Sequence, residues 1–187
     1  MGNSMYRDEE LVIRPIEQRD LPRLWELIYK EESPEWKQWD APYFPHHAKP
    51  LGEFMETAPG WVGCEEMWVI EAEGVVWGIV SYYFEDTTQI WLETGIAIHE
   101  GSNWNKGVGT RALTMWIAHI FTTLPVPRVG LTTWSGNHRM MRVGEKLGMQ
   151  LEGRMRNVRF HDGAYYDSIR MGILREEWEA DSTERLL

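Results

Sequence analysis

The sequence predicts an α+β fold, in which an antiparallel strand meander is followed by alternating helices and strands. Three runs rich in β-branched and aromatic residues, at 67–72, 75–84 and 90–98, follow one another across short turn-forming segments, which is typical of a meander. Two later runs, at 113–121 and 140–147, repeat their apolar residues at helical spacing. This change of period indicates strands first and helices afterwards.

The chain has 187 residues, which corresponds to one domain at roughly 150 residues per domain. We therefore expect a single domain over residues 1–187. Residues 33–63 form an excursion within it, where prolines recur among aromatic side chains. Long regular elements are not expected there, apart from a short helix near 53–57.

The N-terminal part predicts one strand and one helix. Apolar and polar residues alternate over 11–16, which indicates a strand. Asp20 suits a helix N-cap, and Pro22 is tolerated in a first helical turn. The residues that share one face at helical spacing are Leu21, Leu24, Trp25 and Ile28.

Turn and cap signals place the remaining elements. Glu73 and Gly74 have the chemistry of a tight hairpin turn between the first two strands of the meander. Prolines after residue 124 end the helix around 113–121, and Gly148 is placed to cap the next helix. Further strands are expected at 128–134, 151–156 and 168–174, with a turn around residues 162 and 163.

Composition excludes several classes of protein. There are 19 Lys and Arg against 29 Asp and Glu, and the net charge of −10 argues against a nucleic-acid partner. No stretch reaches the ~18 apolar residues of a membrane helix, and the N-terminal segment has neither a secretory signal nor a myristoylation motif. We expect a soluble, cytoplasmic protein without a membrane partner.

The cysteine and histidine content argues against a metal centre. The single cysteine, Cys64, excludes an internal disulfide and a cysteine-built zinc site, which fits a reducing cytoplasm. The six histidines show no helical His-x-x-x-His spacing, and the adjacent His46 and His47 are expected in an exposed loop. We expect no metal.

A loop with two glycines lies between the strand ending at Ile98 and the helix containing Leu113. Its sequence, Trp-Asn-Lys-Gly-Val-Gly-Thr at 104–110, opens a helix. Glycines at a helix start expose backbone N–H groups at the positive end of the helix dipole, which favours binding of an anion such as phosphate. Neither a Walker loop nor a dinucleotide fingerprint is matched. The alternative, that the glycines only allow tight packing, stays open.

The order of elements and a set of motifs resemble the GNAT superfamily of acetyltransferases. The family loop is Gln/Arg-x-x-Gly-x-Gly/Ala; Gly107 and Gly109 match it, whereas Trp104 stands where Gln or Arg is usual. That departure is similar to the subgroup of ribosomal-protein N-terminal alanine acetyltransferases (RimJ/RimL-like). The other motifs shared with this subgroup are Asn137 at the start of the last long helix and the segments 146–149, 152–156 and 163–167.

The resemblance covers nearly the whole chain and is weakest over 33–63. It implies a mixed, mostly antiparallel central sheet flanked by helices, with a splayed strand pair that binds acetyl-CoA as co-substrate. Backbone groups of Ile96, Ala97 and Ile98 would pair with the pantetheine arm like an added strand. The backbone amides from Lys106 to Thr110 would hold its pyrophosphate. The cofactor-binding residues of this loop would be Trp104, Asn105, Lys106, Gly107, Val108, Gly109 and Thr110.

Asn137 would hydrogen-bond the cofactor in such a protein. The alternative is an ordinary helix N-cap, and both roles stay open.

The chemistry implied by the resemblance needs a base, because an ammonium has no lone pair with which to attack a thioester. Glu93 is acidic in an otherwise apolar strand, and the related subgroup has a Glu at this place. Burial would raise its pKa and suit it to general-base work, directly or through a water; the alternative is a Glu on the solvent face. Gly144 aligns with a Tyr that many family members aim at the leaving thiolate. Either close packing or space for substrate explains the glycine, and water or the hydroxyl of Ser135 would protonate the thiolate.

The sequence says least about the amine that would accept the acetyl group. Aromatic residues of 33–63, with Tyr165 and Tyr166, would line an acceptor pocket, or they only pack the core. Negative net charge favours a cationic amine. The basic residues of the closing strands, which would bind an acceptor carboxylate or pair with surface acids, are Arg154, Arg156, Arg159 and Arg170.

Two functions of different class follow. The first is a cytoplasmic N-acetyltransferase that transfers an acetyl group from acetyl-CoA to a primary amine, either a protein N-terminus or a small molecule. The second is a non-catalytic acyl-CoA-binding or interaction module with the same fold. Whether the chain forms a homodimer is left open.

Overall fold

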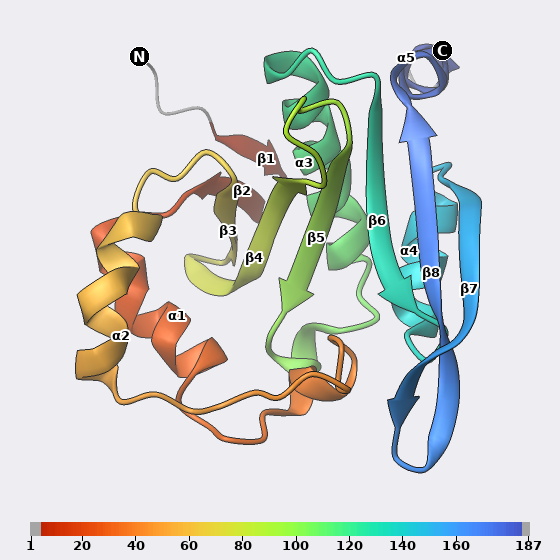
Figure 1. The fold of residues 1–187 in the computed structure, drawn as a ribbon. Helices are drawn as coiled ribbons and strands as arrows, with labels where there is room; N and C mark the ends of the chain where they lie inside the picture. Colours follow the sequence, from red (N-terminus) through yellow and green to blue (C-terminus); the bar gives the residue numbers. More distant parts are fainter. Residues whose placement is uncertain (1–4, 185–187) are drawn as a thin grey trace. The chain divides into compact units, whose positions relative to one another are not determined.

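The computed structural model describes residues 5–184, in which eight strands form one mixed, mostly antiparallel sheet flanked by helices (Figure 1). The strand order is β1-β2-β3-β4-β5-β6-β8-β7. The predicted fold class is confirmed. Within the described residues, no helix combines the length and the apolar character that crossing a membrane requires.

The chain divides into two compact units. Strands β4 (Val75–Phe84) and β5 (Leu92–Ile98) and helix α3 (Val108–Thr123) each begin in one unit and end in the other. The single domain over 1–187 stays a prediction. The first unit is Met1–Ser81 with Ile96–Met115, and the second unit is Tyr82–Gly95 with Trp116–Leu187.

Antiparallel strands build the sheet of the first unit. Strand β1 (Tyr6–Asp8), which the sequence did not predict, pairs with β2 (Leu11–Pro15), and β2 pairs with β3 (Met67–Ala72). Strand β3 pairs in turn with β4 across Glu73 and Gly74, whose φ angles are 53° and 76°. Two successive positive φ angles are what a tight I′ hairpin turn requires, so the predicted hairpin is confirmed.

Two helices and the proline-rich excursion complete the core of the first unit. Helix α1 (Leu21–Ile28) confirms the predicted amphipathic helix, and α2 (Leu51–Thr57) begins two residues before the predicted short helix. Trp36 and Phe54 of the excursion are buried in the core of this unit, so these two aromatic residues serve packing, whereas Phe44 is exposed. The buried cluster comprises Ile16, Leu21, Leu24, Leu27, Ile28, Trp36, Phe54, Ala58, Val69 and Val76.

Asp20 does not cap α1 with its side chain, contrary to the prediction. Its carboxylate instead accepts hydrogen bonds from the Glu17 N–H at 2.8 Å and from Arg14 Nη1 and Nη2 at 2.7 and 2.8 Å. The physical reason is that Arg14 is buried and needs a charged partner more than an exposed helix end needs a cap.

The second unit contains the one parallel strand pair. Strand β5 runs parallel to β6 (Arg128–Trp134), and β6 pairs antiparallel with β8 (Ala164–Leu174). Strands β7 (Gln150–His161) and β8 form a hairpin whose turn residues, Asp162 and Gly163, both have positive φ. The turn is as predicted, whereas both strands extend well beyond the predicted 151–156 and 168–174.

Helix α4 (His138–Lys146) ends as the sequence predicts. Gly148 has a φ of 81°, and the N–H of Met149 donates to the carbonyl of Gly144 at 3.0 Å, which closes a glycine-capped helix end. Helix α5 (Arg175–Glu184) was not predicted. The guanidinium group of its first residue, Arg175, donates to two carbonyls at the end of α3. One is that of Phe121, within α3, and the other is that of Leu124, just after it, both at 2.6 Å.

Candidate functional site

The glycine loop lies in the first unit, between the 3-10 turn Gly101–Asn103 and helix α3. Asn105, Lys106 and Gly107 are exposed, and Asn105 and Gly107 have φ angles of 60° and 77°. The N–H of Arg111 donates to the Gly107 carbonyl at 3.1 Å, which makes Gly107 the residue where helical bonding begins. The N–H groups between them therefore have no carbonyl one turn earlier to bind.

This loop has the geometry of an anion cradle. The N–H groups of Val108, Gly109 and Thr110 point out of the first turn of a helix, where the dipole is positive. A Cβ placed on Gly107 would find no atom within 4 Å, so the space beside this glycine is open. Because the space beside Gly107 is open, tight packing does not explain this glycine. Its positive φ angle does.

Trp104 has a different role from the one expected. Its backbone N–H donates to the Gly101 carbonyl at 3.1 Å, and its indole Nε1 donates to the Ile98 carbonyl at 2.7 Å. These bonds fasten the loop to the end of β5. They occupy the N–H of Trp104 and one of the two lone pairs of the Ile98 carbonyl, and the cofactor-binding roles of Trp104 and Ile98 stay predictions.

Strand β5 passes close to its neighbour in the first unit. A Cβ on Gly78 would collide with the carbonyl of Ala97, so only glycine fits at this position of β4. Ile96, Ala97 and Ile98 are half-buried.

The register of β5 with β6 covers only the first part of β5. It runs from Leu92 opposite Val129 to Thr94 opposite Leu131, while β5 continues to Ile98 and β6 to Trp134. A strand that continues beyond its ladder has backbone groups that are available to another extended chain.

Glu93, in the second unit, is completely buried, with 0% of its surface exposed. Its Oε1 accepts from Trp91 Nε1 at 2.8 Å and from Arg128 Nη1 at 3.0 Å. Its Oε2 accepts from the Thr132 hydroxyl at 2.9 Å. The alternative of a Glu on the solvent face is therefore wrong. A carboxylate so enclosed cannot touch an acceptor amine directly.

The partners of Glu93 follow from the parallel register. Glu93 lies opposite Gly130, so Arg128 and Thr132, two residues before and after it, lie on the same face of β6. A Cβ on Gly130 would come within 2.5 Å of Glu93 Oε1, so glycine at this position leaves the room that the ion pair fills. Sequence analysis missed both partners because it did not establish which strand lies beside β5.

Thr132, a partner of Glu93, also interacts with a partly exposed side chain. Its hydroxyl is one of the groups that influence the pKa of Tyr83, which is 49% exposed. Burial of the phenol, with the charges of Glu85 and Glu93, raises the pKa of Tyr83, so this hydroxyl keeps its proton at neutral pH. Tyr83 was not singled out from the sequence.

Ser135 and Asn137 follow β6 in the second unit. Ser135 Oγ accepts from the Asp167 N–H at 2.9 Å, which leaves the proton of its own hydroxyl unused by that bond. Asn137 Oδ1 accepts from the Met140 N–H at 3.0 Å, the geometry of an N-cap. A Cβ on Gly144 would lie 2.8 Å from the sulfur of Met171, so close packing explains this glycine.

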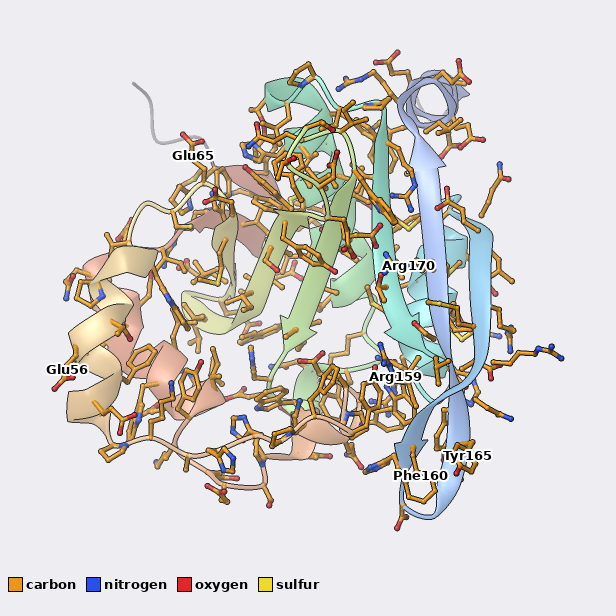
Figure 2. All side chains as sticks on the ribbon, in the orientation of Figure 1. Glu56, Glu65, Arg159, Phe160, Tyr165 and Arg170 are labelled. Carbon is orange, nitrogen blue, oxygen red and sulfur yellow. The ribbon has the colours of Figure 1, made fainter. Side chains whose placement is uncertain are left out.

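The predicted basic and aromatic groups are only partly brought together. Arg154 pairs with Asp167 at 2.9 Å, and Arg170 pairs with Glu85 at 3.1 Å, so both have acidic partners. Tyr166 packs on Trp134, with ring centroids 4.8 Å apart. Tyr165 is exposed beside Phe160 at the β7–β8 hairpin, and Figure 2 shows both away from Arg170.

Comparison with known proteins agrees with this arrangement. The family described as "Acetyltransferase (GNAT) domain" matches residues 10–150. An SPbeta prophage-derived uncharacterized N-acetyltransferase of Bacillus subtilis (strain 168) is 28% identical over 182 residues, which cover 96% of this chain and 98% of that protein.

Two solved structures share the fold. A spermidine N-acetyltransferase from Vibrio cholerae, in complex with CoA and spermine, superposes with a TM-score of 0.74 at 20% identity, over 92% of this chain and 99% of the other. An acetyl transferase from Salmonella typhimurium that modifies the N-terminal serine of ribosomal protein L7/L12 gives a TM-score of 0.69 at 17% identity, over 89% and 96%.

Proposed function

The chain belongs to the GNAT family and is an N-acetyltransferase; from this premise we propose that it transfers an acetyl group from acetyl-CoA to a primary amine by direct attack of the amine on the thioester. The observation that carries the proposal is the start of α3, where N–H groups without helical partners follow the exposed residues 105–107 and the space beside Gly107 is open. A diphosphate fits such a cradle because it supplies several anionic acceptors to fixed donors.

The residues that would hold the diphosphate and the pantetheine arm of acetyl-CoA belong to the first unit. The N–H groups of 107–110 would bind the diphosphate, and exposed Lys106 would add positive charge. The backbone of Ile96 and Ala97, beyond the paired part of β5, would bind the pantetheine arm by strand addition. Bound in this way, acetyl-CoA supplies an activated acetyl group.

Glu93 would accept the proton of the amine through its hydroxyl neighbours. Thr132 has one hydroxyl proton and donates it to Glu93, so in this proposal Tyr83 would donate its own hydroxyl proton to the Thr132 oxygen. When Tyr83 takes a proton from the ammonium, its own proton passes to Thr132 and that of Thr132 passes to Glu93 Oε2. One N–H bond breaks and one carboxyl O–H bond forms, and both hydroxyl groups are restored.

Ser135 and Asn137 complete the proposal in the second unit. The unused hydroxyl proton of Ser135 would be donated to the CoA thiolate. Asn137, whose Oδ1 caps α4, would contact the cofactor. A peptide N-terminus and a small cationic amine both remain acceptors to test; the net charge of −10 supports a cationic one.

The anion cradle is tested by changing the ligand and the protein together. We expect acetyl-CoA to bind about 100-fold more tightly than acetylpantetheine, which lacks the diphosphate, because two hydrogen bonds to a charged group are lost. Lys106→Ala should weaken acetyl-CoA binding about two- to fivefold and leave acetylpantetheine unaffected. Lys146→Ala, at an exposed lysine of α4, is the matched control. Equal calorimetric affinities for the two ligands would contradict the cradle.

Catalysis is tested by following thiol release from acetyl-CoA with a panel of amines and N-terminal peptides. Acceleration by at least one primary amine is the expected result. Binding of acetyl-CoA without acceleration by any of them would favour the non-catalytic module.

A further inference from the structure

Arg128 joins the carboxylate of Glu93 to a second carboxylate of the same unit, that of Glu152. Its Nη1 donates to Glu93 Oε1 at 3.0 Å, and its Nε donates to Glu152 Oε1 and Oε2 at 3.1 and 3.0 Å. The two carboxylates thus bind different nitrogens of one guanidinium group. Glu93 is fully buried, whereas the side chain of Glu152 is 35% exposed, so the arginine connects a buried acid with a surface acid.

Two neighbouring glycines make room for this connection. Gly130 of β6 lies opposite Glu93 on one side and opposite Gly172 of β8 on the other. A Cβ on Gly130 would collide with the guanidinium group of Arg128. A Cβ on Gly172 would come within 2.5 Å of Glu152 Oε1. Neither glycine has a positive φ angle, so both are explained by the side chains that pass over them.

Glu152 reaches Arg128 from a β-bulge. The register of β7 with β8 shifts between Leu151 and Gly153, which leaves Glu152 without a partner residue in β8. A bulge re-aims a side chain that regular alternation would place elsewhere. Glu152 is also the first residue of the segment 152–156, which the sequence singles out and the proposed reaction does not use.

The charges around Glu93 leave room for one proton. A second arginine, Arg170, lies 3.8 Å from Glu93 Oε1 and pairs with Glu85 at 3.1 Å. The ion pairs therefore join two arginines with three carboxylates. If Glu93 takes up a proton, Arg128 keeps Glu152. Arg170 likewise keeps Glu85, so neither arginine loses its last ion pair. The other polar side chains that interact with Glu93, all neutral at pH 7, are Tyr83, Trp91 and Thr132.

Glu152 also stabilises the charge of Arg128 itself. Burial opposes that charge, but the bonds with Glu152 and Glu93 outweigh it and raise the pKa of Arg128. Without Glu152, the arginine would depend on Glu93 alone, and a proton on Glu93 would then break its ion pair. Breaking a buried ion pair on one side is costly, so Glu93 would accept a proton less readily.

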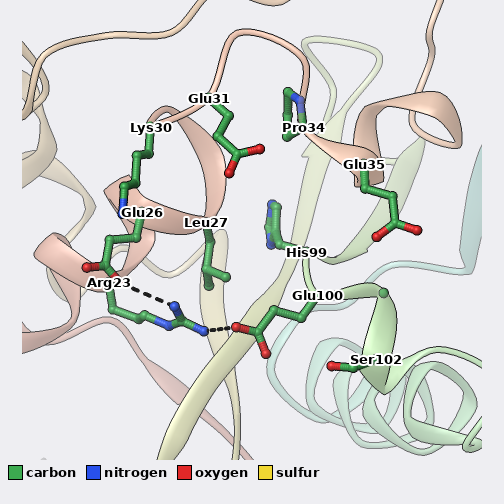
Figure 3. A pocket seen from close by; sticks show the side chains of 11 residues that line it. Arg23, Glu26, Leu27, Lys30, Glu31, Pro34, Glu35, His99, Glu100 and Ser102 are labelled. Atoms are coloured by element: carbon green, nitrogen blue, oxygen red, sulfur yellow. Dashed lines mark hydrogen bonds and ion pairs between the residues drawn. The ribbon is translucent and has the colours of Figure 1, made fainter.

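A shared arginine does not have this effect by itself, as Arg23 in the first unit illustrates (Figure 3). Arg23 pairs with Glu26 and Glu100, whose side chains are 46% and 37% exposed, so water can stabilise either carboxylate. His99, close to this arginine, is buried. Burial, helped by the charge of Arg23, lowers the pKa of His99 to about 4, so the ring is neutral at pH 7. The second unit differs because one carboxylate that shares its arginine is fully buried.

We propose that Glu152 is a positioning residue for the reaction: through Arg128, it allows Glu93 to accept a proton without leaving the arginine unpaired. This inference rests on the proposed role of Glu93 as the base. Glu152 gains and loses no proton in the step. The amine N–H bond breaks and the Glu93 O–H bond forms, as described above.

The first test follows the proton on Glu93 directly and needs no ligand. The glutamate carboxyl groups of the full chain are labelled with ¹³C, and the Glu93 signal is identified by its loss in Glu93→Gln. In Glu152→Gln, the pH midpoint of the Glu93 signal should fall by about one unit, because a nearby negative charge is lost and Arg128 is left to Glu93 alone. An unchanged or raised midpoint would overturn the proposal.

Turnover provides the second readout, with a primary amine that accelerates thiol release. Glu152→Gln should lower kcat about three- to tenfold, because a weaker base accepts the proton more slowly, while KM for acetyl-CoA stays within about threefold. A structural role would lower the urea midpoint and leave kcat of the folded protein unchanged, and that result would overturn the proposal. If the chain unfolds before Glu93 titrates, kcat decides.

Glu85→Gln is the matched control. It removes the same charge from Arg170, whose distance of 3.8 Å from Glu93 is longer than a hydrogen bond. Its shift of the Glu93 midpoint should be less than about half of that in Glu152→Gln. An equal shift would show a general effect of nearby charge and overturn the role of the shared arginine.

Failure of this inference is distinguishable from failure of the proposed function. A folded Glu93→Gln protein that turns over normally would overturn Glu93 as the base, and the role of Glu152 with it. An unmoved midpoint and an unchanged kcat in Glu152→Gln would overturn the role of Glu152 alone.

Discussion

Two buried carboxylates, Asp20 in the first unit and Glu93 in the second, have the same chemistry and different surroundings. Asp20 is 4% exposed and Glu93 is 0% exposed, and each accepts hydrogen bonds from an arginine. Burial raises the free energy of any carboxylate charge, and the fold supplies hydrogen-bond donors to both side chains.

The remaining donors distinguish them. Asp20 accepts from a backbone N–H of Glu17, and its partner Arg14 continues to Glu71. Glu93 accepts from Thr132, which leads to the half-exposed hydroxyl of Tyr83. A buried ion pair therefore does not indicate function by itself; the side chains that connect it with the surface do.

The largest expected effect is that of Glu93→Gln on turnover. Loss of a general base lowers kcat about 10²- to 10⁴-fold, because the amine then has no acceptor for its proton. The affinity for acetyl-CoA, whose proposed ligands are in the glycine loop, should stay within about threefold by calorimetry.

Glu85→Gln is the matched control for this variant. Glu85 pairs with Arg170, which also lies 3.8 Å from Glu93, but it is outside the hydroxyl chain. We expect kcat of this variant to stay within about threefold of the parent. A Glu93→Gln protein that is folded and turns over normally would remove Glu93 as the base.

Asp20→Asn should act on stability and leave turnover alone. The change leaves buried Arg14 with Glu71 at 2.6 Å and the more distant Glu17 at 4.0 Å as carboxylate partners, and breaking a buried ion pair on one side costs about 3 kcal/mol of unfolding free energy. Urea unfolding measures this loss. Glu10→Gln, at the exposed ion pair with Arg111, should change the unfolding free energy much less. A large fall in kcat with unchanged stability would reverse the roles assigned to Asp20 and Glu93.

The pH dependence of stability separates Asp20 from His99 in the same unit. Burial opposes the charge of Asp20, but the bonds from Arg14 and Glu17 outweigh it and hold its pKa below 3.8. Its stabilisation is complete above that pH and is lost only below it. His99, with a pKa near 4 against an ordinary 6.5, stays neutral in the folded chain while the unfolded chain takes up a proton.

Stability should consequently fall by up to about 3 kcal/mol as the pH decreases from 6.5 to 4, and His99 accounts for this loss. Urea midpoints across this range provide the measurement. His99→Gln should make the unfolding free energy nearly independent of pH in this range. Asp20→Asn should lower the unfolding free energy at every pH of the range without changing the slope. A slope that persists in His99→Gln would contradict the assignment.

Local chemistry made most of the fold predictable. The hairpin at Glu73 and Gly74 and the helix end at Gly148 follow from positive φ angles that few residues adopt. Helix α5 was missed because its apolar periodicity is weak; Trp178 is its one buried large apolar residue among the described side chains. The outer part of β7 was missed because most of its side chains are exposed and do not alternate.

The site was predictable where it depends on one segment and not where it depends on strand pairing. The exposed glycines of the loop are a local signal, and Glu93 stands out as an acid in an apolar strand. Arg128 and Thr132 become partners of Glu93 only through the parallel register of β5 with β6, which nonlocal contacts determine. Trp104 gave no signal that its indole would bind the end of β5.

The smallest expected effect tests the step between Glu93 and the surface. Tyr83→Phe and Thr132→Val each remove one hydroxyl, and each should lower kcat about tenfold, less than loss of the base itself. Thr132→Ser, which keeps the hydroxyl, should stay near the parent rate. If the two hydroxyl groups act in one chain, the double variant loses no more than Thr132→Val alone, because breaking the chain twice has the effect of breaking it once. Rate losses that multiply in the double variant would show separate roles, and Glu93 would then need another route to the proton.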